Sequence, residues 1–204
     1  MSSRLAALVL VGTLCGGGLA VAQDSDAPAP GLIEVTYMPA GAGFVPAKNH
    51  APSFGNYGFG TAVTVNVNRY LGIEGELSTM IATTSDLQFG DLNSHVKAPN
   101  MLNYTGNVLV TPFTFNRFVP YGTVGIGGLS MFARPELGVR DDQTFLSGNV
   151  GGGLKWYAPN NRWGIRADYR FGIVKSKDTA PAFFGRETRN MHRVYAGIII
   201  NTRK

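Results

Sequence analysis

The chain has 204 residues, of which 27 are Gly, 11 are Pro and one is Cys, and Asp, Glu, Lys and Arg together make up 15%. Soluble domains usually carry about 25% charged residues, so this composition argues against a cytosolic protein. A hydrophobic content of 44% excludes intrinsic disorder, which needs low hydrophobicity and high net charge. Abundant Gly without a three-residue period argues against collagen and against a helix bundle, because interior Gly weakens a helix by about 1 kcal/mol.

The N-terminal segment has the pattern of a secretory signal peptide. Arg4 supplies a positive start, residues 5–14 form a short apolar run, and Ala20-Val21-Ala22 is a small-x-small cleavage site. We expect residues 1–22 to be removed, which leaves a mature net charge of +4 (the formal +5 less Arg4) and no cysteine. Residues 23–30, QDSDAPAP, are polar and Pro-rich and are predicted to be an unstructured tail.

Beyond residue 31 the hydrophobic pattern has a period of two residues. Residues 163–173, for example, alternate between large apolar side chains at most odd positions and Gly, Arg or Asp at even ones. Such alternation is typical of β-strands with one apolar face. We find no apolar run of the roughly 18 residues that a transmembrane helix needs. The pattern predicts eight strands, over residues 32–38, 57–68, 71–81, 101–115, 120–132, 145–157, 163–173 and 191–202.

The connections between these strands alternate in length. Three are tight turns, at residues 68–70, 116–118 and 158–162. The others are longer and polar and contain Gly or Pro, at residues 39–56, 82–100, 133–143 and 175–190. Strict alternation of short and long connections is typical of an antiparallel up-and-down barrel whose two rims face different compartments.

Alternation alone does not say which face meets lipid, since a soluble lipocalin-like barrel alternates equally well. Three features favour lipid outside. The polar face is mostly Gly, Ser, Thr and Asn, several strands reach the roughly 9–11 residues of a tilted spanning strand, and aromatic residues gather near strand ends. These aromatic residues are Tyr57, Tyr70, Phe113, Phe115, Phe118, Tyr121, Phe132, Trp156, Tyr157 and Trp163.

We therefore predict an all-β fold, an eight-stranded antiparallel up-and-down transmembrane β-barrel over residues 31–204. Pro112 falls inside the fourth predicted strand, where a closed barrel has no free edge to absorb its missing N–H. We expect it near the short-turn rim, at a bulge.

Four stretches share a pattern of alternation and Gly placement: residues 58–76 (GFGTAVTVNVNRYLGIEGE), 120–128 (PYGTVGIGG), 150–170 (VGGGLKWYAPNNRWGIRADYR) and 195–198 (YAGI). In these stretches the chain resembles the small outer-membrane β-barrel proteins, whose barrel domain is similar to that of OmpA and OmpX. The resemblance implies an outer-membrane location and insertion by the outer-membrane insertion machinery. It also implies long loops outside, with the short turns and the residue 23–30 tail in the periplasm. We expect a monomer.

The polar face of the predicted strands carries three acids and four bases. Eight strands close around a space that side chains nearly fill, and an unpaired ion in a low dielectric costs several kcal/mol. We therefore expect a polar plug of ion pairs and hydrogen bonds formed by Glu74, Glu76, Lys155, Arg166, Asp168, Arg170 and Arg193. The alternative is a gated ion path, in which Arg166 or Lys155 exchanges carboxylate partners.

Three functions compete for such a barrel. The first is a structural or interaction role in the cell envelope, the second a porin-like channel for small solutes or ions, and the third, ranked last, a lipid A-modifying enzyme. His192 lies near the outer end of the last strand, but Val194 follows it two residues on and no Ser is adjacent. We therefore expect no enzymatic activity. With three scattered His and no Cys in the mature chain, we expect no metal and no cofactor.

A basic cluster in the last long connection is a candidate contact for an anion. It comprises Lys175, Lys177, Arg186 and Arg189 and is partly offset by two nearby acids. On the outer rim these cations are expected to meet lipopolysaccharide phosphates or an anionic partner. Nucleic acid is not an expected partner, because the positive charge is spread along the chain and the signal peptide directs the chain out of the cytoplasm.

Overall fold

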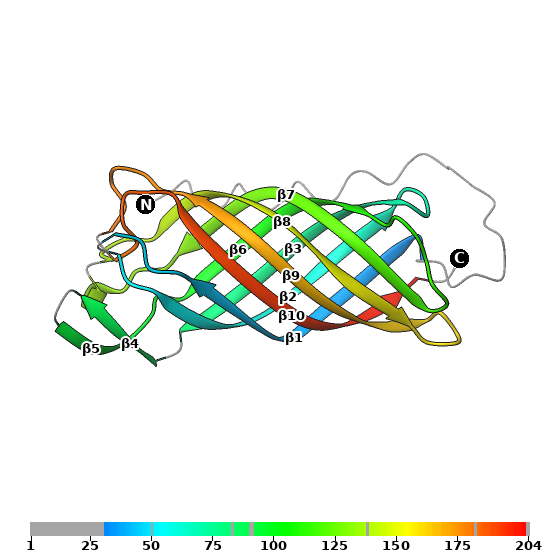
Figure 1. Cartoon of the computed structure of the whole chain (residues 1–204), viewed down its shortest axis with the longest axis horizontal. Coiled ribbons are helices and arrows are strands. Elements are labelled where there is room, and N and C mark those ends of the chain that lie inside the picture. Colours follow the sequence, from blue (N-terminus) through cyan, green and yellow to red (C-terminus); the bar gives the residue numbers. More distant parts are fainter. Residues whose placement is uncertain are drawn as a thin grey trace, which may run out of the picture.

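The chain folds into one closed barrel of eight antiparallel strands, in the order β1-β10-β9-β8-β7-β6-β3-β2 (Figure 1). The computed structural model describes residues 31–202 except residues 50, 83, 90, 91, 138 and 182, and the side chains of residues 82–96 and 136 are not described. The predicted signal peptide and tail lie outside the described residues and stay predictions. Among the described residues, no helix is long and apolar enough to cross a bilayer.

The barrel strands are 10 to 15 residues long, enough to cross the apolar part of a bilayer at a tilt. They are β1 (Ile33–Val45), β2 (Phe54–Asn66), β3 (Leu71–Ala82), β6 (Met101–Val110), β7 (Phe118–Met131), β8 (Gln143–Tyr157), β9 (Trp163–Lys175) and β10 (Arg189–Asn201). Each corresponds to one predicted strand, so the predicted fold class is confirmed.

The connections are short at one end of the barrel, the short-turn end, and long at the other, the long-loop end. The short ones are residues 67–70, 111–117 and 158–162. Asn116 and Asn161 adopt φ of 51° and 50° in two of these turns, a backbone conformation that Asn tolerates better than most residues. β1 begins and β10 ends at the short-turn end, where the Thr202 N–H donates to the Ile33 carbonyl at 3.0 Å.

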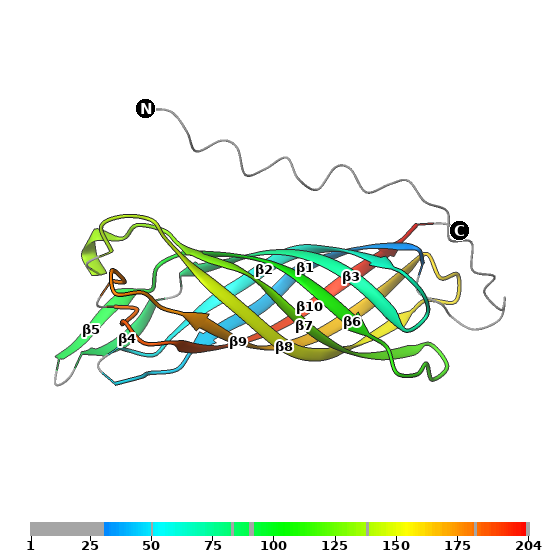
Figure 2. The same ribbon diagram turned by 90° about the horizontal axis from the view of Figure 1, so that it is seen from above.

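The connection between β3 and β6 contains a hairpin of two further strands. β4 (Thr84–Phe89) and β5 (Leu92–Lys97) pair antiparallel and project beyond the rim at the long-loop end (Figure 2). The sequence pattern predicts residues 82–100 as a long polar connection and does not reveal the two strands within it. The two strands form a separate sheet, so no barrel interior imposes the apolar alternation by which the other strands are recognised.

β1 continues past its predicted end at Met38, through a β-bulge. Its register against β2 shifts by one residue between Met38 and Gly41, and its register against β10 shifts at the same place. Pro39 lies in this bulge, where an unpaired residue is tolerated and the missing N–H breaks no ladder bond. The Tyr57 hydroxyl donates to the Pro39 carbonyl. The predicted loop over residues 39–56 is therefore too long, because the bulge interrupts the alternation.

The predicted fourth strand is also too long. β6 ends at Val110, so Pro112 lies in the β6–β7 turn rather than inside a strand. The expected position at the short-turn rim is correct, but no bulge is needed to accommodate Pro112 there, because the strand has already ended.

The outer surface of the barrel is apolar. Val63, Ile73, Val124 and Ile126 point outward and are 46–64% exposed, while the side chains between them on their strands point inward. A soluble barrel would have the reverse arrangement, so the structure places the lipid-compatible face outside. The aromatic residues near strand ends are predicted to lie on the outer face at the membrane interface. This is wrong for Tyr121 and Tyr157, which are buried in the interior.

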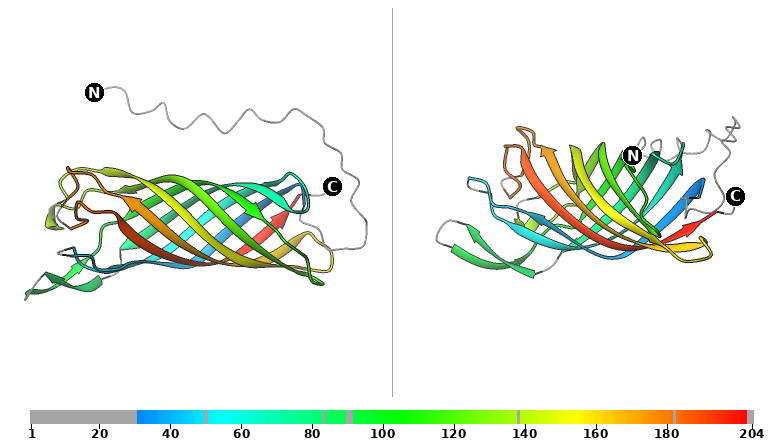
Figure 3. Two further views of the ribbon diagram at one scale, coloured as in Figure 1. Left: turned by 45° about the horizontal axis from the view of Figure 1, so that its top comes forward. Right: turned by 45° about the vertical axis from the view of Figure 1, so that its right-hand side comes forward.

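At the long-loop end the interior changes from polar to apolar. Phe183 and Phe184 of the β9–β10 loop are buried there, with Phe183 tilted against Phe54 at 4.9 Å and Phe184 stacked on Phe145 at 4.5 Å between ring centroids. Figure 3 shows the long loops gathered at this end. The mouth cluster consists of Val45, Phe54, Met80, Ala98, Met101, Leu129, Met131, Val139, Phe145, Val174, Phe183, Phe184 and Met191.

Two glycines on adjacent strands give a matched test of strand packing. A Cβ at Gly127 would collide with the Tyr104 carbonyl and lie 2.7 Å from the Thr105 Cα, whereas a Cβ at Gly106 would meet nothing within 4 Å. We predict that Gly127→Ala lowers the free energy of unfolding by about 1–3 kcal/mol through overpacking. Gly106→Ala should leave it unchanged or raise it by up to about 1 kcal/mol. Urea unfolding in lipid vesicles measures both, and equal effects would contradict the close approach.

Candidate functional site

The inward positions of the barrel strands carry a buried network of charged side chains. All seven residues predicted for the lumen lie inside the barrel and are buried: Glu74 and Glu76 on β3, Lys155 on β8, Arg166, Asp168 and Arg170 on β9, and Arg193 on β10. The structure adds Glu34 from β1. On the short-turn side of the mouth cluster, the described interior therefore holds four carboxylates and four cations, so its formal charges balance.

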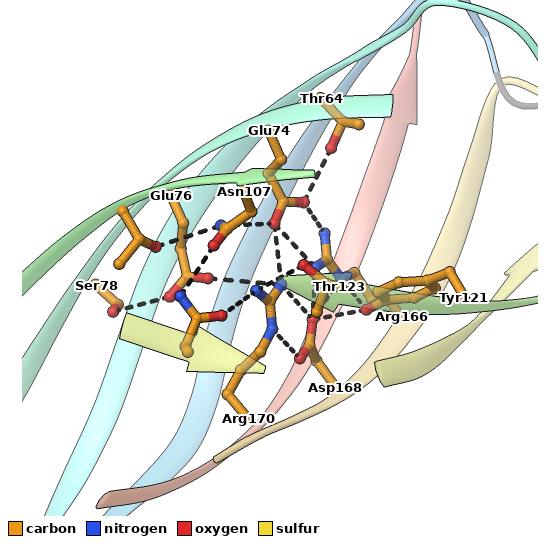
Figure 4. Close-up of polar contacts among 12 residues, drawn as sticks. Thr64, Glu74, Glu76, Ser78, Asn107, Tyr121, Thr123, Arg166, Asp168 and Arg170 are labelled. Atoms are coloured by element: carbon orange, nitrogen blue, oxygen red, sulfur yellow. Dashed lines mark hydrogen bonds and ion pairs between the residues drawn. The ribbon is translucent and has the colours of Figure 1, made fainter. Parts of the chain in front are cut away.

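Arg166 lies at the centre of this network (Figure 4). Its guanidinium contacts both carboxylate oxygens of Glu74, and its Nη2 lies 2.5 Å from Asp168 Oδ2. Its Nε donates to the Tyr121 hydroxyl at 2.7 Å, and that hydroxyl donates to Asp168 Oδ2 at 2.6 Å. Residues 166 and 168 share one face of β9 because side chains on a strand repeat every two residues. One cation thus joins β3, β7 and β9 across the bore.

Arg170 occupies the next inward position of β9 and uses every nitrogen of its guanidinium. Nη2 lies 3.0 Å from Glu74 Oε1, and Nε lies 2.6 Å from Asp168 Oδ1. Nη1 donates to Asn149 Oδ1 at 3.1 Å and to Thr123 Oγ1 at 3.2 Å. Since each donor has an acceptor, the desolvation cost of this buried cation is offset by hydrogen bonds as well as by charge.

Two outlying ion pairs extend the network in both directions. Toward the long-loop end, Arg193 Nη1 lies 2.7 Å from Glu76 Oε1. Toward the short-turn end, Lys155 Nζ lies 2.5 Å from Glu34 Oε2, and the Tyr157 hydroxyl donates to the other oxygen of Glu34. β9 and β10 separate β8 from β1 in the barrel wall, so the Lys155–Glu34 pair crosses the interior and does not run along the wall.

Sequence reasoning missed Glu34, Tyr121 and Tyr157 as members of the network. Glu34 was detectable, since it alternates with Val35 on a predicted strand, but the strand was too short to define its two faces. Tyr121 and Tyr157 stand at odd positions that share the inward face with Thr123 and Lys155. Their place near strand ends favoured the interfacial interpretation, and the parity of their positions was the better signal.

A few buried polar atoms of the interior have no partner among the described residues. They include Asn103 Oδ1, Ser147 Oγ, Arg193 Nε and the Tyr195 hydroxyl. Such atoms are normally satisfied by ordered water. The bore therefore combines an ion-paired centre with polar positions that are suited to water.

The basic cluster predicted for the last long loop does not stay together. Lys175 and Lys177 are exposed, and the Lys177 ammonium lies 5.3 Å from the Phe145 ring centroid. Arg186 is exposed beside the β1–β2 loop, whereas Arg189 is buried and donates to three backbone carbonyls. The prediction of Arg189 as an accessible outer-loop cation is therefore wrong, because the loop folds back into the mouth and encloses the side chain.

His192 lies on the outer face of β10 and contacts aromatic side chains. Its Nδ1 is 2.8 Å from the Tyr169 hydroxyl, and its ring packs edge-on to Phe171 at 5.4 Å. In the part of the chain that the structure describes, no three His, Cys, Asp or Glu side chains are grouped as metal ligands.

A closed antiparallel barrel with an apolar exterior and an ion-paired bore defines the class of small outer-membrane barrels. The chain belongs to the outer membrane protein beta-barrel domain family, whose model matches residues 7–192. The predicted resemblance is confirmed, and the family places the chain in the outer-membrane bilayer. No curated protein matches its sequence.

Two solved structures have the same fold. Neisserial surface protein A (NspA) is 15% identical with a TM-score of 0.57, over 83% of this chain and 97% of that one. Ail, the attachment invasion locus protein of Yersinia pestis, in complex with the heparin analogue sucrose octasulfate, is 15% identical with a TM-score of 0.51, over 84% and 98%. At these identities the likeness shows the fold alone.

Proposed function

We propose that the protein is a closed outer-membrane barrel with a structural or interaction role, which acts through its long-loop end and not through its bore. The observation that carries this proposal is the filling of the interior at two levels. The ion-paired network fills the centre, and the mouth cluster, with Phe183 and Phe184 inserted, fills the outer end. A solute would have to separate buried ion pairs, which costs several kcal/mol for each uncompensated charge.

The orientation and partners form part of the same proposal. The short turns and the N-terminal tail face the periplasm, and the long loops and the β4–β5 hairpin face outward, as is usual for bacterial barrels. The closed sheet has no edge for pairing with another copy, which supports a monomer inserted by the outer-membrane insertion machinery. Lys175 ends β9 on the outward face, where it would meet lipopolysaccharide phosphates.

Enzymatic activity is not part of the proposal. His192 is engaged by Tyr169 on the lipid-facing side, and no serine is bonded to it among the described residues. A Ser-His-carboxylate hydrolase needs its base within hydrogen-bond reach of the nucleophile.

A small-solute or ion channel is the second candidate, and the unpartnered buried atoms of the bore favour it. Asn103, Ser147 and Tyr195 offer positions for water above the central ion pairs. A channel would require these positions to join into a continuous path once the ion pairs and the mouth cluster rearrange.

Planar-bilayer recording separates the two candidates. We predict that the refolded barrel gives no discrete conductance steps above the bare bilayer, because both levels of the interior are filled. Refolding is checked beforehand by heat-modifiable gel migration. Discrete steps whose size changes in Glu74→Gln or Arg166→Ala, but not in the exposed-turn control Arg69→Ala, would replace the closed barrel by the channel.

A further inference from the structure

Arg189 differs from the other buried cations because no carboxylate among the described residues pairs with it. Lys155, Arg166, Arg170 and Arg193 each form an ion pair with a buried acid. Arg189 is 1% exposed, and the described residues provide it with no acid. A buried charge without a countercharge is costly in a protein interior, so Arg189 requires an explanation beyond packing.

Backbone carbonyls hold the Arg189 guanidinium in place. Its Nη1 donates to the Phe184 carbonyl at 2.8 Å, and its Nη2 donates to the carbonyls of Pro46 and Pro52 at 2.6 and 2.8 Å. These bonds fasten the β9–β10 loop to the β1–β2 loop. They neutralise none of the positive charge, and the Nε of Arg189 has no partner.

A surface cavity of about 590 Å³ lies at the same place, between the two loops that Arg189 joins. Among the described residues, its charged lining is three cations and one acid: Lys48, Arg186, Arg189 and Glu187. Gly185 has a positive φ of 79° and completes the wall together with Asn49, Ala51 and Phe184. The cavity therefore combines a buried cation, Arg189, with two exposed cations, Lys48 and Arg186.

Lys48 and Glu187 form an acid–base contact within this cavity. Lys48 Nζ lies 3.6 Å from Glu187 Oε2, and both side chains are about half exposed, at 46% and 55%. Exposed pairs of this kind contribute little to stability, so an incoming anion can displace the carboxylate from Lys48. Asn49 Nδ2 also donates to Glu187, which keeps the carboxylate at the rim.

We propose that this cavity binds a phosphate or sulfate group through Lys48 and Arg186, with the positive charge of the Arg189 guanidinium in its wall attracting the anion. Oxyanions match the fork of donors on Arg186, and the low dielectric around Arg189 strengthens its attraction for an anion. The group belongs either to a lipopolysaccharide headgroup or to a sulfated saccharide outside the cell. The inference deepens the proposed interaction role and rests on it for the outward position of the cavity.

Titration calorimetry of the refolded mature chain in maltoside micelles tests this site, with inorganic phosphate as the probe at constant ionic strength. We expect saturable binding to one site. Lys48→Gln and Arg186→Gln, both at exposed positions, should each weaken it at least about tenfold, since each removes one charge-assisted hydrogen bond to the anion. Glu187→Gln should strengthen it by removing the competing carboxylate.

The matched control is Arg69→Gln, an exposed cation in the β2–β3 turn at the opposite end of the barrel, which should leave phosphate binding unchanged. Absence of saturable binding, or equal weakening by Arg69→Gln and Lys48→Gln, would overturn the proposal as general attraction to a basic surface. Arg189→Gln should abolish binding in molecules that retain heat-modifiable migration.

Two competition arms identify the source of the anion. Displacement of phosphate by lipopolysaccharide-containing vesicles, but not by phosphatidylcholine vesicles, assigns the site to the lipid headgroup. Displacement by a soluble sulfated disaccharide assigns it to a saccharide. The phosphate-binding result is independent of the conductance test. A barrel that conducts ions and still binds phosphate would contradict the proposal of a closed barrel and would leave the proposal of a phosphate site intact.

Discussion

Replacement of Arg166 by Met is expected to lower the free energy of unfolding by about 3–5 kcal/mol, because removal of one partner leaves buried charge uncompensated. Arg166 contacts Glu74 and Asp168 and also donates to the Tyr121 hydroxyl. Arg170 remains near both acids but cannot neutralise two carboxylates alone. Urea unfolding in lipid vesicles, followed by the fluorescence of Trp156 and Trp163, measures the loss.

A double variant separates charge from packing. Arg166→Met combined with Glu74→Gln restores equal numbers of acids and bases in the described interior and should recover part of the lost stability. The control Arg69→Met removes a cation that lies 4.6 Å from the Tyr70 ring in an exposed turn, and should cost no more than about 1 kcal/mol. If Arg166→Met costs as little as Arg69→Met, the network is not the stabilising element described above.

The second large effect is expected at the mouth, where Phe184→Ala should release the β9–β10 loop. Phe184 is fully buried and stacks on Phe145, and Phe→Ala in a core costs about 3–5 kcal/mol. The loss should appear as local opening rather than global unfolding, since the strands keep their own ladders. Because 1.4 kcal/mol is a factor of ten in population, tryptic cleavage at Lys177 and Arg186 should accelerate at least about a hundredfold.

Phe115→Ala is the matched control for the mouth. Phe115 is 67% exposed in the β6–β7 turn at the opposite end of the barrel, so its removal should leave the cleavage rate of the β9–β10 loop unchanged. An unaltered rate in Phe184→Ala would show that the loop is held without the mouth cluster, and the outer closure of the bore would then lack its physical basis.

The period-two pattern predicts the barrel well because one physical constraint acts on nearly every strand. A side chain on β2 or β9 meets either lipid or the bore, so Val63 and Ile165 differ in character from Thr64 and Arg166. The interior charges follow from the same parity. Their pairing does not follow, because partners such as Lys155 and Glu34 are 121 positions apart in sequence, and only the stagger of the closed sheet brings them together.

The sequence does not reveal the parts of the fold in which side chains no longer alternate between lipid and the bore. Pro39 sits at a bulge that reverses the parity of β1, so the continuation of the strand looks like loop. At the long-loop end, inward positions such as Met80 and Met101 are apolar because loops, and not water, cover them. Arginine is usually exposed at a protein surface, so the sequence does not predict that Arg189 is buried. Its burial depends on Phe183 and Phe184 folding into the mouth.

The seam between β1 and β10 determines when the barrel is complete. Glu34 pairs with Asn201 and Phe44 with His192, so one edge of the first strand stays unpaired until the last strand joins the sheet. Until then the growing sheet has two unpaired edges, which are prone to pair with other chains. Contacts this distant in sequence also slow folding, because loop-closure entropy must be overcome first. Closure of the barrel thus depends on the 13-residue strand β10. A chain truncated before β10 would leave the free edges of β1 and β9 unpaired.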